Sequence, residues 1–215
     1  MKMRIFMVCE TLSEETAQTT QLIEVATSLK RFGHEILLFA PTIRKYTGNK
    51  RFNIKYVPTM DIFMLRLPIY QFFLFIYMLI YYLKFKPNLV YTRMGVFSIA
   101  PVLFSKIFGL PHVLHLADDI VENMKINNVN PVLITIYKVI EKISCSNSSR
   151  ITTAHSRVKD IIHERNNILL NKIVLIPNGA NIDAFKPMSI IRVRKELNLE
   201  DDKFYIGFVG GLDRW

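Results

Sequence analysis

The chain has 215 residues, of which 50% are hydrophobic and 21% charged, a composition that excludes a disordered or low-complexity protein. Two cysteines, Cys9 and Cys145, cannot build a disulfide framework, and the apolar run in MKMRIFMVCE is too short for a signal peptide. We therefore expect a reduced, cytoplasmic protein. The net charge of +10 predicts an anionic partner, either nucleic acid, anionic lipid or a phosphorylated substrate.

Short apolar segments alternate with helical segments along most of the chain. We expect strands at residues 3–9, 35–41, 52–58, 88–93, 112–117, 150–154 and 172–177. Helices are expected at residues 16–32, 69–83, 96–108, 131–144 and 156–165. Gly33 and Gly109 follow two of these helices and suit their C-terminal caps. This alternation predicts βαβ crossovers and an α/β fold with a doubly wound, mostly parallel sheet of about seven strands.

The alternation stops at NGANIDAFKP, where Pro187 indicates a linker. Residues 1–187 are predicted to form one Rossmann-like domain. A short helix near residues 190–199 and a strand at 204–209 then suggest that residues 188–215 begin a second domain, which is incomplete in this chain.

The positive charge is concentrated in the first half of the chain. Residues 1–110 contain 14 basic and 6 acidic residues, whereas residues 111–215 contain 14 and 12. Between Ile36 and Ala117 ten basic residues occur with a single acid, Asp61. We expect a cationic face on this part of the molecule.

Residues 69–83, IYQFFLFIYMLIYYL, form an uncharged aromatic helix of about 22 Å, too short to cross a bilayer. Two interpretations are open. The helix is either a buried crossover packed on the sheet, or its aromatic flank enters a membrane interface beside basic residues. In the second case the membrane contacts are predicted to be Arg66, Tyr70, Phe73, Tyr77, Tyr81, Lys84 and Lys86.

Ligands of open α/β sheets bind beyond the carboxyl ends of the strands. Glu10, Thr11 and Thr16 follow the first strand, although Ser13 or Thr16 also suits a helix cap. Asp118 and Glu122 follow the fifth strand on one expected helical face, where carboxylates could hold sugar hydroxyls or act as a base, unless they form a solvated turn. His155 and Ser156 follow the sixth strand, and Ser156 also suits an N-cap. The spacing of cysteines and histidines predicts no metal site, and we expect His34, His112 and His115 to be structural.

Three segments carry a resemblance to a known family. VLIPNGANIDAFKP, residues 174–187, resembles the interdomain segment of retaining glycosyltransferases of the GT-B fold, family 4. RFGHEILLFAP resembles the end of that family's first helix and its second strand, and FYIGFVGGLDRW resembles the opening strand of its C-terminal domain. The resemblance covers essentially the whole chain, but only the N-terminal half of a family member.

The resemblance implies substrate-binding residues in both parts of the chain. Thr16 and Ala17 stand where the family often has a glycine pair near donor phosphate or acceptor. Asp118 matches an aspartate after the fifth strand, whereas Ala117 replaces a frequent histidine. The remaining predicted substrate-binding residues are Asn178, Gly179, Asn181, Gly210 and Gly211.

By this resemblance, the chain is expected to be the acceptor-side domain of an enzyme that moves a sugar from a nucleotide-sugar donor to a lipid-linked or cell-surface glycan. Asp118 and Glu122 are the predicted catalytic residues, and no cofactor or metal is expected. The chain alone is expected to be inactive until a C-terminal donor-binding domain is supplied in cis or in trans. The alternative is a non-catalytic membrane-docking or partner-binding half of a split transferase. Nucleic-acid binding is disfavoured, because the basic residues follow no RNA-binding motif, and peripheral attachment to the inner face of the cell membrane is expected instead.

Overall fold

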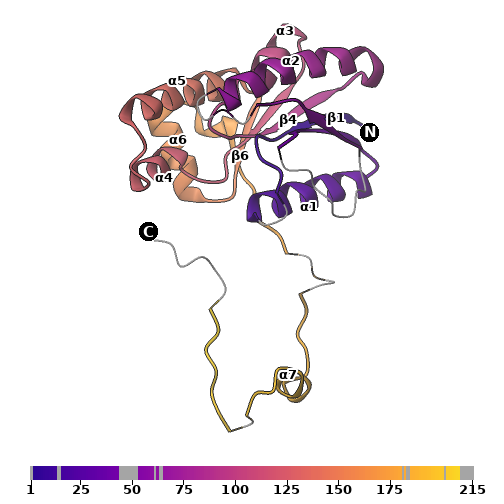
Figure 1. Ribbon diagram of the computed structural model, residues 1–215, viewed down its shortest axis with the longest axis vertical. Coiled ribbons are helices and arrows are strands. Elements are labelled where there is room, and N and C mark those ends of the chain that lie inside the picture. The colour runs from indigo at the N-terminus through magenta and orange to yellow at the C-terminus, as the bar shows by residue number, and fades with distance from the viewer. Residues whose placement is uncertain are drawn as a thin grey trace. The chain divides into compact units, whose positions relative to one another are not determined.

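The computed structural model describes residues 2–13, 16–43, 53–60, 62, 65–180, 182, 185–200 and 202–208. Within these residues seven parallel strands form one sheet in the order β3-β2-β1-β4-β5-β6-β7 (Figure 1). The predicted α/β fold with a doubly wound parallel sheet is therefore confirmed. The strands are β1 (Arg4–Val8), β2 (Glu35–Pro41), β3 (Asn53–Val57), β4 (Leu89–Arg93), β5 (His112–His115), β6 (Arg150–Thr153) and β7 (Ile173–Leu175).

The helices between β1 and β7 are α1 (Ala17–Arg31), α2 (Arg66–Phe85), α3 (Ala100–Ile107), α4 (Ile120–Ile126), α5 (Pro131–Asn147) and α6 (Ser156–Asn166), with a 3-10 turn at Leu170–Lys172. Five of these six helices lie at the expected segments, although their ends differ, whereas α4 was not among the expected helices. Helix α2 is longer than expected and α3 begins four residues later. Gly33 and Gly109 follow α1 and α3 with positive φ angles of 86° and 62°, which confirms their predicted role at helix ends.

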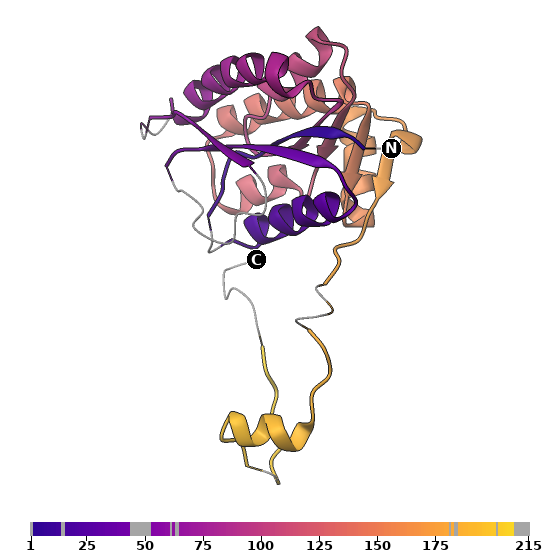
Figure 2. The ribbon, with the colours of Figure 1, turned by 90° about the vertical axis from the view of Figure 1, so that its right-hand side faces the viewer.

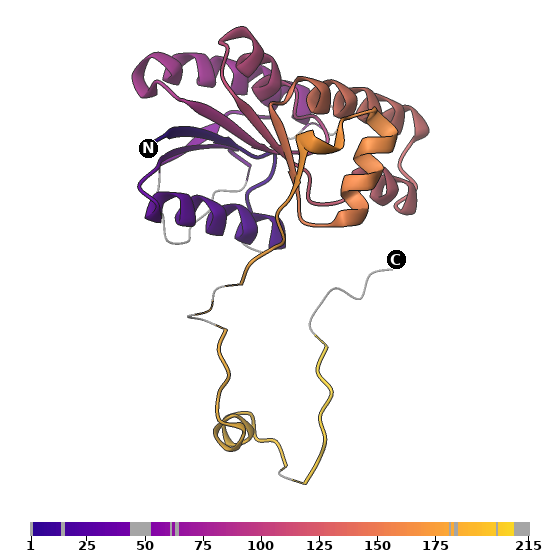
Figure 3. The same cartoon turned by 180° about the vertical axis from the view of Figure 1, so that it is seen from behind.

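Side chains alternate along the central strands between two cores. Ile5 and Met7 point to the face covered by α1, where they pack against Leu22 and Ala26. Phe6 on β1 points to the other face, which α2 and α3 cover. Figure 2 shows α1 and α2 on opposite faces of the sheet, and in Figure 3 α2 and α5 lie on the same side.

The chain divides after Pro177 into two compact units. The second unit contains α7 (Ile190–Glu196), in which Arg192 pairs with Glu196 at 2.7 Å. In its described part, residues 203–208 form no strand, and Phe204, Ile206 and Phe208 are exposed. The expected boundary after residue 187 and the expected donor-binding domain remain predictions.

Candidate functional site

The carboxyl ends of the parallel strands meet at one edge of the sheet, where the strand order reverses between β1 and β4. Ligands of open α/β sheets bind in the crevice outside such a reversal. Glu10 and Thr11 follow β1 at this point, and Arg93 is the last residue of β4. Asp118 follows β5, the next strand of the sheet. The edge therefore brings together residues from separate predicted segments.

The Glu10 carboxylate is buried and fastens the loop that follows β4. The backbone N–H of Phe97 donates to both of its oxygens at 3.0 and 3.1 Å, and the Ser98 hydroxyl donates at 2.9 Å. Gln71 of α2 donates at 3.0 Å and also accepts from the N–H of Ala100 at 2.9 Å. Burial raises the pKa of the Glu10 carboxyl to about 7. The predicted substrate-binding carboxylate thus holds the protein's own loop.

Gly95 lies directly against this carboxylate. A Cβ atom at residue 95 would lie 2.6 Å from Cδ of Glu10 and 3.0 Å from its Cβ. Because four hydrogen bonds hold the carboxylate, it cannot turn away without losing them. We expect Gly95→Ala to lower the free energy of unfolding by about 1–3 kcal/mol in urea denaturation. Gly179→Ala is the control, because a Cβ there meets nothing within 4 Å. Equal losses in both variants would contradict a fixed Glu10.

Arg93 and His115 form a second cluster on the α1 side of the same edge. The Arg93 guanidinium donates to Oε1 of Gln21, and the Gln21 amide nitrogen lies 3.4 Å from Nε2 of His115. Burial lowers the pKa of Arg93, whereas the negative charge of Asp118 acts in the opposite direction. Among the described residues no carboxylate oxygen lies within ion-pair distance of Arg93. Arg93 therefore supplies a positive charge at the reversal point, and the negative charge of Asp118 acts on it without an ion pair.

The hydrogen bonds of His115 determine its tautomer. Because the amide oxygen of Gln21 accepts from Arg93, its amide nitrogen faces His115 and must donate to Nε2. The other ring nitrogen, Nδ1, then donates to Oγ1 of Thr152 at 3.0 Å. Burial, followed by the nearby charge of Arg93, lowers the pKa of His115 to about 4. His115 is therefore a neutral, structural histidine in this geometry, in agreement with the sequence interpretation.

The expected Asp118–Glu122 pair does not share a helical face. Helix α4 begins at Ile120, so Asp118 lies before it, exposed, in the turn after β5. Asp119 is the N-cap, and its Oδ1 accepts from the N–H groups of Val121 and Glu122 at 3.1 and 3.3 Å. The Glu122 carboxylate is exposed and pairs with Lys125 at 3.2 Å. Asp118 is thus an exposed carboxylate in the turn at this edge, while Asp119 caps the helix and Glu122 pairs within it.

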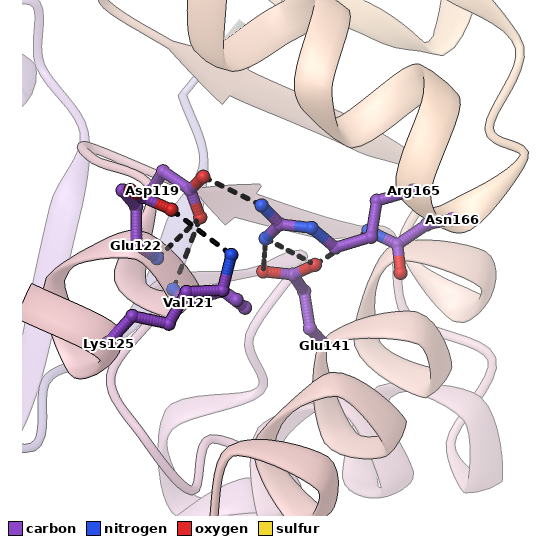
Figure 4. A network of polar contacts seen from close by, with 7 residues as sticks. All are labelled: Asp119, Val121, Glu122, Lys125, Glu141, Arg165 and Asn166. Carbon is purple, nitrogen blue, oxygen red and sulfur yellow. Dashed lines mark hydrogen bonds and ion pairs between the residues drawn. The ribbon is translucent and has the colours of Figure 1, made fainter. Parts of the chain in front are cut away.

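A network of polar contacts joins α4, α5 and α6 next to Asp119, the residue that follows Asp118 (Figure 4). Arg165 of α6 pairs with Oδ2 of Asp119 at 2.7 Å and with the buried carboxylate of Glu141 on α5 at 3.4 Å. Asn166 donates to the same Glu141 carboxylate at 2.7 Å. The start of α4 is therefore tied to both α5 and α6, which positions the turn that carries Asp118.

The other predicted residues of the first unit lie at the expected ends of their elements. Thr11 and Ala17 are exposed, and Thr16 is the N-cap of α1, where its side chain accepts from the N–H of Thr19 at 3.3 Å. His155, not Ser156, occupies the N-cap position of α6, and its side chain makes no capping bond. A role in substrate binding stays a prediction for each of them.

The predicted residues of the C-terminal segment belong to the second unit or lie outside the described residues. Asn178 and Gly179 are exposed at the start of the second unit. Asn181, Gly210 and Gly211 are outside the residues that the structure describes. Across the described part of the chain, no three His, Cys, Asp or Glu side chains are grouped closely enough to hold a metal ion.

The comparison with protein families decides the identity of the chain. The model of glycosyltransferase family 4 matches residues 18–184, which include nearly all of α1 and the elements from β2 to β7, with Arg93 and Asp118. The chain belongs to glycosyltransferase family 4. A comparison with curated proteins gives no match.

Solved structures similar to this family 4 chain share its fold at low sequence identity. A glycosyltransferase from Rickettsia africae ESF-5 has a TM-score of 0.61 and 15% identity, covering 94% of this chain and 51% of that one. Sucrose-phosphate synthase from Thermosynechococcus elongatus has a TM-score of 0.66 and 13% identity over 93% and 53%. Anabaena HepE, solved with UDP-glucose, has a TM-score of 0.62 and 14% identity over 91% and 50%. The chain spans about half the length of these GT-B neighbours.

The aromatic helix of this family 4 domain turns a different face to solvent than the predicted one. Tyr70 is buried, contrary to the prediction, and its hydroxyl donates to the carbonyl oxygen of Cys9 at 2.6 Å. Phe73, Tyr77 and Tyr81 are half-buried against the sheet. Helix α2 has 20 residues and is long and apolar enough to cross a membrane by length and composition, so the length argument against spanning is wrong. Its inner side is nevertheless part of the core.

Sequence reasoning missed Arg93 and Gln21. Arg93 is the charged last residue of NLVYTR, at the carboxyl end of a strand, so the rule that drew attention to Glu10 and Asp118 applies equally to it. Gln21 had no such signal, because a glutamine in the second turn of an amphipathic helix is ordinary. Its contact with Arg93 joins residues 72 positions apart.

Proposed function

We propose that this domain is the acceptor-side half of an enzyme that transfers a sugar from a nucleotide-sugar donor to a lipid-linked or cell-surface glycan. The observation that carries the proposal is the family 4 match over residues 18–184, which contain Arg93 at the reversal point of the sheet and Asp118 after the neighbouring strand β5. HepE, one of the structural neighbours, is solved with UDP-glucose, which supports a nucleotide sugar as the donor class.

The chemistry assigns different tasks to the two charged residues. The acceptor hydroxyl attacks the anomeric carbon of the donor sugar while the bond to the nucleoside diphosphate breaks, and a donor phosphate oxygen takes the hydroxyl proton. The exposed carboxylate of Asp118 accepts hydrogen bonds from sugar hydroxyls and orients them. The positive charge of Arg93 favours a phosphate group at the same edge. No protein base is required by this scheme.

A second domain is needed to hold the donor in attack geometry against this one. Such positioning lowers the activation barrier of the transfer by about 7–11 kcal/mol. We therefore expect no transfer by the 215-residue chain alone and transfer when a donor-binding domain is supplied in cis or in trans. The assay follows release of nucleoside diphosphate together with incorporation of sugar into the acceptor. Steady turnover by the isolated chain would contradict this division of labour. Absence of transfer with every donor-binding domain supplied would favour the alternative function, a non-catalytic membrane-docking or partner-binding half of a split transferase.

When the chain is combined with a donor-binding domain and transfers sugar, Asp118→Asn should lower kcat/KM about 10- to 100-fold. The reason is that a hydrogen bond to a charged group contributes roughly 1.5–3 kcal/mol. Asp160→Asn is the matched control, since Asp160 is an exposed carboxylate on α6 away from the strand ends. Equal kcat/KM in the two variants would remove Asp118 from the site.

A further inference from the structure

Helices α2, α3 and α5 together turn an apolar surface to solvent, which we call the outer helix face. The three helices cover the same side of the sheet, so their outer sides point away from it together (Figures 1 and 3). The exposed apolar residues of the outer helix face are Phe72, Leu79, Ile80, Leu83, Leu103, Ile107, Val132, Ile136, Val139 and Ile143. On α5 they recur every three to four residues and form one stripe along the helix.

The other helices of the domain do not share this pattern. On α1, which covers the opposite face of the sheet, the exposed positions are polar or small and include Thr20, Glu24 and Ser28. Helix α6 exposes the carboxylates of Asp160 and Glu164. Single exposed apolar residues are common in soluble proteins, but a contiguous patch marks an interaction site. Among the helices of the first unit, α4 exposes one large apolar residue, Ile126, and a run of several such residues occurs on α2 and α5, with two more on α3.

The charges on the outer helix face have one sign. Helices α2, α3 and α5 contain a single acid, Glu141, which is buried and bonded to Arg165 and Asn166. Exposed lysines lie among and beside the apolar residues: Lys84, Lys86, Lys106, Lys138 and Lys142. An exposed surface of apolar side chains and lysines complements a phospholipid bilayer with anionic headgroups.

We propose that the outer helix face docks flat on an anionic phospholipid bilayer, with α5 contributing as much of the contact as α2. The apolar side chains enter the interface and the lysine ammonium groups meet headgroup phosphates. From the inner side of α2, Tyr70 donates to the carbonyl oxygen of Cys9 and Gln71 donates to the carboxylate of Glu10. Because these contacts hold α2 in the core, the helix lies along the membrane and does not cross it. A symmetric dimer through the same face would bring ten lysines together with no exposed acid, which disfavours a second copy.

The test measures co-sedimentation of the chain with vesicles and needs no transfer activity, so its outcome is separate from that of the proposed function. Vesicles contain either phosphatidylcholine alone or equal parts of phosphatidylcholine and phosphatidylglycerol. We expect binding to the anionic vesicles to be at least about tenfold stronger, since each lysine near the surface contributes to the attraction. The difference should disappear in about 1 M NaCl, where the Debye length is about 3 Å.

Variants on α5 distinguish the outer helix face from contact through α2 alone. Val139→Glu and the double change Lys138→Glu with Lys142→Glu should each weaken binding to anionic vesicles about tenfold or more, and Leu83→Glu on α2 should do the same. Thr20→Glu on α1 adds the same charge to the opposite face and should bind as the unchanged chain does. Full binding by both α5 variants, or equal binding of the chain to neutral and anionic vesicles, would overturn the proposal. Dimerisation in ultracentrifugation that Val139→Glu abolishes, without vesicle binding, would assign the face to a second copy instead.

Discussion

The free energy of unfolding should fall steeply when the pH is lowered from 6.5 to 4, because two buried histidines must be protonated. His112 and His115 both have pKa values lowered to about 4, chiefly by burial. In the unfolded chain their pKa is near 6.5, so the unfolded state binds more protons across this interval. Each histidine then removes up to about 3 kcal/mol, which for two is comparable with the whole stability of many domains.

The hydrogen bonds of His112 explain why its neutral form is required. The Ser148 hydroxyl donates to the carbonyl oxygen of Ser144 at 2.6 Å, so its oxygen accepts from Nδ1 of His112 at 2.9 Å. The other ring nitrogen, Nε2, accepts from the Thr92 hydroxyl at 2.9 Å. In the neutral ring, Nδ1 thus donates and Nε2 accepts, and both have partners. A proton added to Nε2 would face the hydroxyl hydrogen of Thr92 and would leave a buried charge without an acceptor there.

The carboxyl of Glu10 acts in the opposite direction. Its pKa is raised to about 7 by burial, so below that value the folded state binds the extra proton and gains stability as the pH falls. Its contribution of about 3 kcal/mol offsets that of one histidine. Urea denaturation between pH 7 and pH 4 should therefore show a net loss of about 3 kcal/mol for the unchanged chain, and a steeper one for Glu10→Gln.

Histidine variants separate these contributions. His112→Gln should lower the free energy of unfolding at neutral pH, because the hydrogen bonds of the imidazole are lost. Between pH 6.5 and 4, however, the free energy of unfolding of this variant should fall less with pH than that of the unchanged chain. His155→Gln is the matched control, because it removes an imidazole from an exposed position. If the free energy of unfolding falls as steeply between pH 6.5 and 4 in His112→Gln as in the unchanged chain, groups other than His112 cause the loss.

The fold could be predicted from the sequence because it depends on local patterns. Strands such as RIFMV and EILLFAP are short apolar runs between helical segments, and this alternation determines a parallel sheet. The start of α3 could not be predicted. The N–H of Phe97 and the hydroxyl of Ser98 bind Glu10, which lies 87 and 88 positions away, so the helix begins only at Ala100.

The orientation of α2 was ambiguous for a similar reason. A helix that is apolar all round gives no periodicity from which to infer its inner face. The single amide, Gln71, would be placed outside by its polarity, yet it is buried because Glu10 and the N–H of Ala100 are its partners. A polar residue alone in an apolar helix was in fact the signal for the inner face. The place of Asp118 beyond a strand end could be predicted and the same rule would have found Arg93, whereas Gln21 was missed because a contact between distant segments decides its position.

Arg165→Met should lower the free energy of unfolding by about 3–5 kcal/mol, the second large effect expected for this domain. The change removes the cation that Glu141 and Asp119 share. Glu141 is 1% exposed, so its charge would remain buried without a cation, although Asn166 would still donate a hydrogen bond to it. Breaking a buried pair from one side costs more than the pair contributes, because the remaining charge has no water to replace its partner.

Two further variants test this explanation of the loss. Adding Glu141→Gln to Arg165→Met removes the stranded charge and should recover a large part of the stability. Lys125→Met breaks the exposed Glu122–Lys125 pair of α4 and should change the free energy by no more than about 0.5 kcal/mol, because exposed ion pairs contribute little. Urea denaturation of all three variants at neutral pH provides the measurement. Similar losses in Arg165→Met and Lys125→Met would contradict the network.

Arg165 also anchors Asp119, the N-cap residue of α4, so its loss should loosen the turn that carries Asp118. When the Arg165→Met chain is combined with a donor-binding domain, kcat/KM should therefore fall together with stability.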